Sequence, residues 1–128
     1  MELFLREGFI VHGARGVEPF KAPPDVKNDS FGRQKPGRPD AVCFDRTNNR
    51  IIFGLVRCAR EELDSEDALE EYNVFLDHNA GLGNQASIVY VMLPPQLIAD
   101  FTGVITHYIH REYWHRVIPV RSKEPNSG

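Results

Sequence analysis

The sequence has little of what marks several common protein classes. Its 128 residues include only two cysteines, Cys43 and Cys58, with one tryptophan and two methionines. The cysteines show no CxxC spacing and no histidine at a metal-ligand interval, which argues against a disulfide framework and against the familiar zinc motifs. We expect both to be buried, reduced thiols, since free cysteine behaves as a small buried hydrophobe.

Long apolar runs and catalytic signature motifs are lacking as well. The longest apolar runs, such as residues 86–93, fall far short of the roughly 20 residues needed to cross a bilayer. The N-terminus lacks the charged start and apolar stretch of a signal peptide. Neither GxSxG nor GxxxxGK[ST] occurs, so nothing supports an α/β hydrolase or a P-loop nucleotide hydrolase. The sequence therefore predicts a cytoplasmic protein without a membrane span.

The charge is distributed unevenly along the chain. The formal net charge is -3, yet residues 61–77 contain eight acidic residues and no basic one. The other ten acids are outnumbered by all 15 Lys and Arg, which gives the rest of the chain a net charge of +5. This pattern indicates a polar molecule with one acidic helix and a basic remainder.

Length and composition favour one folded unit. At 128 residues and 41% hydrophobic residues, the chain is long enough for one core and too short for two ordinary domains. We expect a single domain over residues 1–121 and a disordered tail over residues 122–128, which are rich in polar and small residues. Residues 13–37 contain four prolines and several glycines, which predicts a long loop or arm.

The hydrophobic pattern alternates between strand and helix periods. Beside a very short helix at residues 3–6, it predicts strands at 9–12, 40–45, 50–58, 87–93 and 117–121. It also predicts two longer helices, one that begins near residue 64 and one that Pro94 and Pro95 open. The strand at 87–93 is continuously apolar, as expected for a central strand, and Pro119 places the last strand at an edge. The predicted fold class is α/β, a mixed sheet with flanking helices.

A short motif stands at the start of the predicted hairpin. Gly37-Arg38-Pro39-Asp40 precedes one strand, and the next strand runs from Arg50 to Arg57. This arrangement resembles the PD-(D/E)XK nuclease superfamily, whose members place Pro-Asp at the head of one strand and Glu-x-Lys on the next. The resemblance covers roughly residues 9–93, and it implies a restriction endonuclease-like αβββαβ core.

The resemblance also implies a metal site, which this sequence matches only in part. In the family, two carboxylates hold Mg²⁺, which generates a nucleophilic water, while the lysine adds positive charge near the phosphate. Asp40 matches the family aspartate, Leu55 falls where the second acid belongs, and Arg57 falls where the lysine belongs. One carboxylate opposite a leucine is a poor Mg²⁺ site, and an arginine that stays charged cannot act as a base.

The expected geometry of the hairpin also predicts a cationic neighbour for Asp40. If the turn is a two-residue Asn48-Asn49 loop, Asp40 faces Arg57 and Val42 faces Leu55 across the two strands. Asp40 would then have a cationic neighbour in place of a metal partner. A three-residue loop would shift this register by one residue.

Three interpretations of the site stay open. In the first, Asp40 and Arg57 form an ordinary cross-strand ion pair without chemistry. In the second, the fold has lost catalysis and keeps a phosphate-binding face. In the third, Glu61 or Glu62 rebuilds a Mg²⁺ site with Asp40, as the resemblance implies for enzymes that relocate this acid. The phosphate-binding face would consist of Arg38, Arg57 and Arg60 with the basic arm of Arg15, Lys21, Lys27, Arg33 and Lys35.

The histidines and aromatic residues near the C-terminus have structural explanations. His107 and His110 share a helix face as metal ligands can, but no acid or cysteine completes a motif with them or His115. Tyr113 and Trp114 could stack on bases, yet aromatic residues here more often anchor a helix end on the core.

We therefore predict a catalytically impaired nuclease-like domain, without a cofactor, that binds DNA, another nucleic acid or a protein partner. An active Mg²⁺ nuclease using Asp40, Arg57 and Glu61 or Glu62 is one alternative. A structural or regulatory subunit, completed by another chain or a second copy, is the other.

Overall fold

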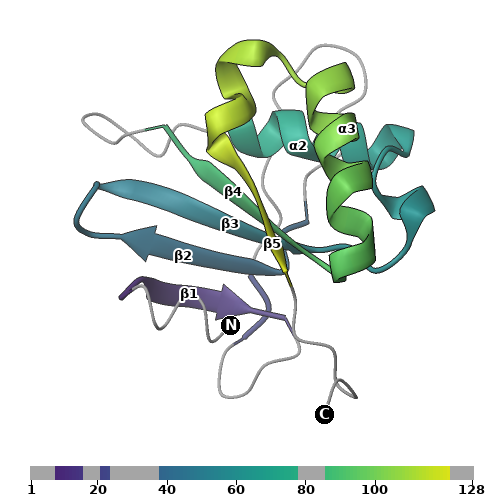
Figure 1. Ribbon diagram of the computed structural model, residues 1–128. Coiled ribbons are helices and arrows are strands. Elements are labelled where there is room, and N and C mark those ends of the chain that lie inside the picture. The colour runs from purple at the N-terminus through teal and green to yellow at the C-terminus, as the bar shows by residue number, and fades with distance from the viewer. Residues whose placement is uncertain (1–7, 16–20, 24–37, 78–85, 122–128) are drawn as a thin grey trace.

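A five-stranded mixed sheet forms the centre of the protein. The computed structural model describes residues 8–15, 21–23, 38–77 and 86–121. The sheet order is β1-β2-β3-β4-β5 (Figure 1). The strands are β1 (Ile10–Ala14), β2 (Ala41–Asp45), β3 (Arg50–Val56), β4 (Ile88–Leu93) and β5 (Val117–Arg121). Two α-helices are described, α2 (Glu66–Asp77) and α3 (Ile98–Tyr108), with short 3-10 helices η1 (Arg60–Glu62), η2 (Pro95–Leu97) and η3 (Arg111–Arg116).

The strand directions divide the sheet into two halves. β1, β2 and β3 form an antiparallel meander, whereas β4 pairs parallel to β3 and β5 pairs parallel to β4. The parallel pairs need crossovers, and α2 and α3 supply them. The predicted α/β class with a mixed sheet and flanking helices is thus confirmed. The predicted helix at residues 3–6 and the tail at 122–128 lie outside the described residues.

Both helices pack on one face of the sheet (Figure 1). Phe53 of β3 stacks on Phe75 of α2 with ring centroids 4.7 Å apart, and Tyr72 meets Phe101 of α3 edge to face at 5.8 Å. All four rings are buried. Burying each such side chain contributes about 1.5–3 kcal/mol, so this aromatic cluster fixes the position of α2 over β3.

The two cysteines occupy different environments. Cys43 is buried on the other face of the sheet beside Ile52 and Ile88, and burial raises the pKa of its thiol to about 11. Cys58 is exposed just beyond the end of β3, so the expectation of two buried thiols was wrong for this residue. The reason is local, because the run of buried residues in β3 ends at Leu55, Val56 is exposed, and the strand ends there.

The turn between β2 and β3 differs from the predicted two-residue loop. Asp45 pairs with Arg50, so the turn spans residues 46–49, with Asn49 at a φ of 52°. Asp45 builds this longer turn, because its carboxylate accepts from the main chain of Thr47 at 3.1 Å and from the Asn48 side chain at 2.8 Å. The register is therefore two residues away from the predicted one. Side chains keep the predicted faces, but their partners across the strands change.

Asp45 should make the stability of the hairpin depend on pH. Its burial works to raise its pKa, but hydrogen bonds from Asn48 and Thr47 and the charge of Arg50, 3.4 Å away, outweigh burial and lower the pKa. A lowered folded-state pKa stabilises the protein above the unfolded value of about 3.9, and this contribution is lost as the pH falls further. We expect the parent protein to exceed Asp45→Asn in free energy of unfolding by a constant amount above about pH 5. Urea titrations should show the difference shrinking below that pH, and a constant difference down to pH 2 would contradict this role.

A buried arginine forms hydrogen bonds with the C-terminal end of α2. Arg116, at the end of η3, donates from Nη2 to the carbonyl oxygen of Leu76 and from Nε to that of Ser87 at 2.8 Å. The Ser87 hydroxyl donates to the carbonyl oxygen of Phe75. These bonds satisfy carbonyl groups that a helix end leaves unpaired. Arg116 thereby joins α2, the start of β4 and η3.

The described residues contain no helix that is both long and apolar enough to cross a membrane.

Candidate functional site

A cavity of about 640 Å³ opens where β2 begins and β3 ends, beside α2. Its walls carry charges of both signs. The described lining residues are Arg15, Arg38, Asp40, Val56, Arg57, Glu62, Asp67, Glu70 and Glu71. Acids thus outnumber bases on the walls. Three of the predicted catalytic residues line this cavity: Asp40, Arg57 and Glu62.

Asp40 joins the first three strands. Its main-chain N–H donates to the carbonyl oxygen of Gly54 at 2.8 Å, and its Oδ2 accepts from the N–H of Val56 at 2.9 Å. Arg15 donates its main-chain N–H to the Asp40 carbonyl oxygen at 2.7 Å, and its Nε lies 3.9 Å from Oδ1. One carboxylate oxygen is therefore engaged at the end of β3, and the other faces a half-exposed arginine.

The predicted pairing of Asp40 with Arg57 across the hairpin was wrong. Val42 lies opposite Phe53, and the same register places Asp40 opposite Leu55, which is fully buried. The cause is the four-residue turn that Asp45 builds. Leu55 thus lies beside Asp40, where the resemblance implies the second acid.

Arg57 binds an acid from α2. Its Nη2 lies 3.1 Å from Oε1 of Glu71, and its guanidinium lies 5.7 Å from the centroid of the Tyr72 ring. The Arg57 side chain is only 11% exposed. Burial works to lower the pKa of Arg57, but Tyr72 and Glu71 outweigh it and raise that pKa, so the guanidinium stays charged. Arg57 is a fixed cation and not a proton acceptor.

Glu71 connects Arg57 to the start of β2. While Oε1 meets Arg57, Oε2 accepts from the main-chain N–H of Arg38 at 2.7 Å. The sequence predicted an acidic helix, but Glu71 was not identified as a site residue. The signal was present, since Asp67, Glu70 and Glu71 follow the i, i+3, i+4 spacing of one helix face.

The two glutamates proposed to rebuild a metal site have different surroundings. Glu62 lines the cavity, but its Oε1 accepts from the main-chain N–H groups of Cys58 at 2.9 Å and Ala59 at 2.8 Å. Glu62 thereby fixes the link from β3 to η1. Glu61 is exposed and is not among the described lining residues.

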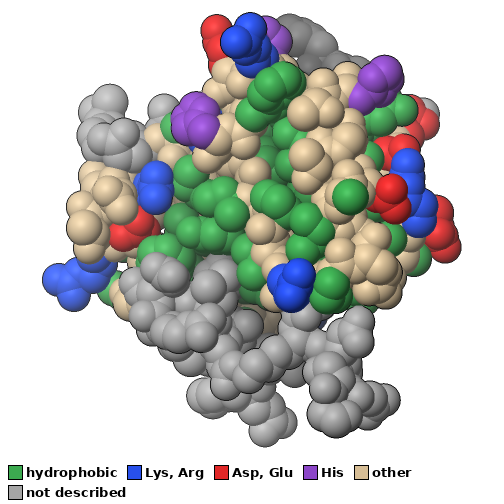
Figure 2. Space-filling model, in the orientation of Figure 1, with side chains coloured by type: hydrophobic (Ala, Val, Ile, Leu, Met, Phe, Trp, Pro, Cys, Tyr) green, Lys and Arg blue, Asp and Glu red, His purple; other side chains and the backbone are tan. Residues whose placement is uncertain are grey.

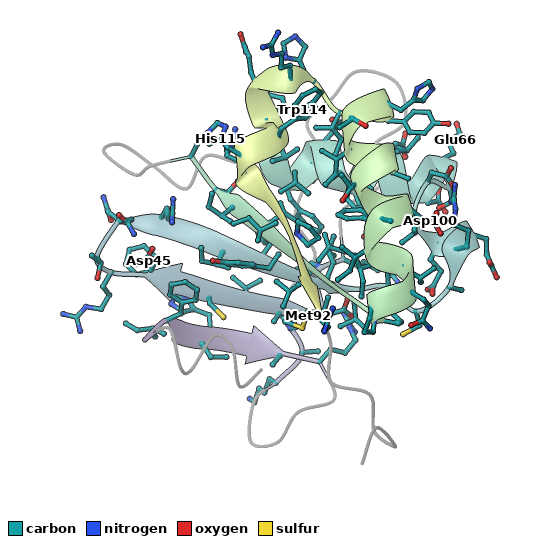
Figure 3. All side chains as sticks on the ribbon, in the orientation of Figure 1. Asp45, Glu66, Met92, Asp100, Trp114 and His115 are labelled. Carbon is teal, nitrogen blue, oxygen red and sulfur yellow. The ribbon has the colours of Figure 1, made fainter. Side chains whose placement is uncertain are left out.

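The predicted phosphate-binding residues have different surroundings. Arg38 is exposed at the cavity. Arg60 lies on η1, with its side chain 51% exposed, and pairs with Asp64 at 3.2 Å and Asp100 at 3.9 Å. Figure 2 shows acidic and basic side chains together along the right-hand edge of this view, where Figure 3 labels Asp100 and Glu66. Lys35 and Arg33 lie outside the described residues and stay predictions.

The donor set does not fit a Mg²⁺ ion. Mg²⁺ requires near-octahedral oxygen coordination, usually with one or two carboxylates. No group of three or more His, Cys, Asp or Glu with metal-binding geometry occurs within the described ranges, at this cavity or near the histidines. Asp40 faces a leucine and an arginine, and Glu62 is bound to two main-chain amides.

The aromatic residues near the end of α3 act partly as anchors. Trp114 donates its indole N–H to the carbonyl oxygen of Ile109 at 2.8 Å, and Tyr113 packs against the core below Arg116. Figure 3 labels Trp114 and His115, which lie in the upper part of that view. Tyr108 stays half exposed.

No protein-family model matches the chain, and neither the curated proteins nor the solved structures contain a match.

Proposed function

We propose that this chain is a nuclease-like α/β domain that binds nucleic acid through phosphate contacts and does not cleave it by metal-dependent chemistry. The observation that carries the proposal is that two residues at the cavity differ in type from those that the resemblance implies. Leu55 stands beside Asp40 in place of an acid, and Arg57 stands in place of the lysine and is held by Glu71. The order β1, hairpin, α2, β4 also agrees with the core that the resemblance implies.

Phosphate contacts are assigned to the arginines around the cavity. Arg15 and Arg60 have side chains 46% and 51% exposed, and Arg38 is exposed between them along the chain. Arginine binds phosphate through paired N–H groups and stays charged at every physiological pH. The acids of the inner walls repel phosphate, so the backbone of the ligand would follow the mouth of the cavity as long as Glu71 is bound to Arg57.

Salt-dependent binding tests this function. We expect the chain to bind a labelled oligonucleotide in fluorescence anisotropy, with affinity falling steeply as salt rises because phosphate contacts release counterions. Arg38→Ala should weaken binding and reduce the slope of log K against log salt by about 0.9. Arg46→Ala, on the exposed turn at the other end of the β2–β3 hairpin, is the matched control and should leave both unchanged. No salt-dependent binding, or equal losses in both variants, would contradict the proposal and favour a structural subunit.

A second candidate function has one specific observation in its favour. Asp67, Glu70 and Glu71 of α2 line the same cavity as Asp40, so carboxylates of a helix share this cavity with the residue that matches the family aspartate. In this alternative, an acid of α2 takes the role of the second metal-binding carboxylate that was predicted for Glu61 or Glu62. Mg²⁺-dependent cleavage that is lost in a Glu70→Gln or Glu71→Gln variant would establish this alternative.

A further inference from the structure

The carboxylate of Glu71 lies where two donors from distant parts of the chain converge. Arg57 approaches from the end of β3 with its Nη2 at 3.1 Å, and the main-chain N–H of Arg38 approaches from the start of β2 at 2.7 Å. We infer that the Arg57 guanidinium and the Arg38 amide form an anion site, which Glu71 fills in this structure and which a phosphate group of the ligand occupies when Glu71 leaves. This inference rests on the proposed function and adds an internal competitor to it.

The donors are of the kind that bind phosphate. A guanidinium combined with a main-chain N–H is a common arrangement at phosphate contacts, because charge-assisted hydrogen bonds to anionic oxygens are strong. A carboxylate and a phosphate both offer such oxygens. The chemical class of ligand is therefore a phosphate monoester or diester, and not a cation or a neutral group.

Arg57 is held in place by contacts other than the one with Glu71. The Arg57 main chain donates to the carbonyl oxygen of Met92 at 3.0 Å, and its guanidinium lies against Tyr72. Tyr72 is fully buried, and its hydroxyl donates to the carbonyl oxygen of Leu63 at 2.9 Å. Arg57 therefore keeps its position when the carboxylate is removed.

Glu71 is the more exposed partner of the pair. Its side chain is 21% exposed against 11% for Arg57, and it stands on the cavity wall. A change of the Glu71 rotamer on α2 would turn the carboxylate away without moving the segment after β3 that carries Arg57. The ion pair is thus an autoinhibitory contact, in which the chain supplies its own anion.

Pyrophosphate binding measured by calorimetry separates this inference from a general effect of charge. We expect Glu71→Gln to bind pyrophosphate about tenfold more tightly than the parent protein. In the variant no carboxylate competes with the phosphate for the Arg57 guanidinium. Glu70→Gln removes the same charge from the same helix face and cavity, and should gain at most about threefold. Adding Arg57→Gln to Glu71→Gln should return the affinity to the parent value.

Equal gains in the two single variants, or a gain that survives the loss of Arg57, would overturn the inference. If Glu71→Gln does not fold, Glu71→Asp replaces it, because a carboxylate one methylene shorter cannot reach both donors. That variant should show a smaller gain, and no gain would overturn the inference equally. Salt-dependent oligonucleotide binding by the parent protein with equal gains in both variants would refute the anion site alone. No binding of oligonucleotide or pyrophosphate by any variant would refute the proposed function as well.

Discussion

Replacing Arg116 with methionine is expected to lower the free energy of unfolding by about 3 kcal/mol. Methionine retains much of the aliphatic volume, but the carbonyl oxygens of Leu76 and Ser87 lose the guanidinium that satisfies them in a buried environment. A buried acceptor that loses its donor destabilises the folded state by the full free energy of its desolvation. Urea denaturation followed by circular dichroism measures the loss as a lower midpoint at unchanged slope.

Arg111→Met is the control for this change. Arg111 lies on the same 3-10 helix but is exposed, so its replacement should change the free energy of unfolding by less than about 0.5 kcal/mol. A loss below about 1 kcal/mol in Arg116→Met would mean that the buried carbonyl groups find other partners, and that Arg116 does not fasten α2.

Replacing Glu71 with alanine is expected to cost about 3–5 kcal/mol, because it leaves the buried guanidinium of Arg57 without its counterion. A second substitution, Arg57→Met, should restore most of the lost stability. In the Arg57→Met, Glu71→Ala double variant no charge is stranded, so most of the stability should return, as is found when buried ion pairs are replaced by apolar groups. Urea titrations of the four proteins give the coupling energy as a double-mutant cycle.

Glu70→Ala is the matched control on the same helix face. No ion pair joins Glu70 to another residue in the described part of the chain, so its loss should cost less than about 1 kcal/mol. If Glu71→Ala and Glu70→Ala cost the same, or if Arg57→Met does not rescue the loss, the Arg57–Glu71 pair is not a stabilising contact between α2 and the end of β3.

The elements of this fold were predictable because their signals are local. The apolar run of β4, the helical spacing of Leu69, Tyr72 and Phe75 on α2, and the alternation in β2 each reflect burial directly. The turn was not predictable from the Asn48-Asn49 pair, because Asp45 outside that pair sets its length through its side chain. One side chain therefore decided the register of the whole hairpin.

The candidate site was predictable only where it depends on the hairpin alone. The sequence predicted a direct pair of Asp40 with Arg57, which was wrong, although both residues line the cavity. It could not identify Glu71, because that contact depends on the rotation of α2 about its axis, which the stacking of Phe75 on Phe53 determines. A pattern of acids at helical spacing gives a shared face, but only packing shows whether that face meets solvent or a strand end.

Calorimetric titration of Mg²⁺ and Mn²⁺ into the parent protein and into Asp40→Asn tests the central claim most directly. Asparagine keeps an oxygen that accepts from the Val56 N–H, so the strand ends should remain joined. We predict no metal binding that distinguishes the two proteins, together with intact oligonucleotide after incubation with either metal. Metal binding that is present in the parent protein and lost in Asp40→Asn, accompanied by cleavage, would contradict the account and establish a working nuclease.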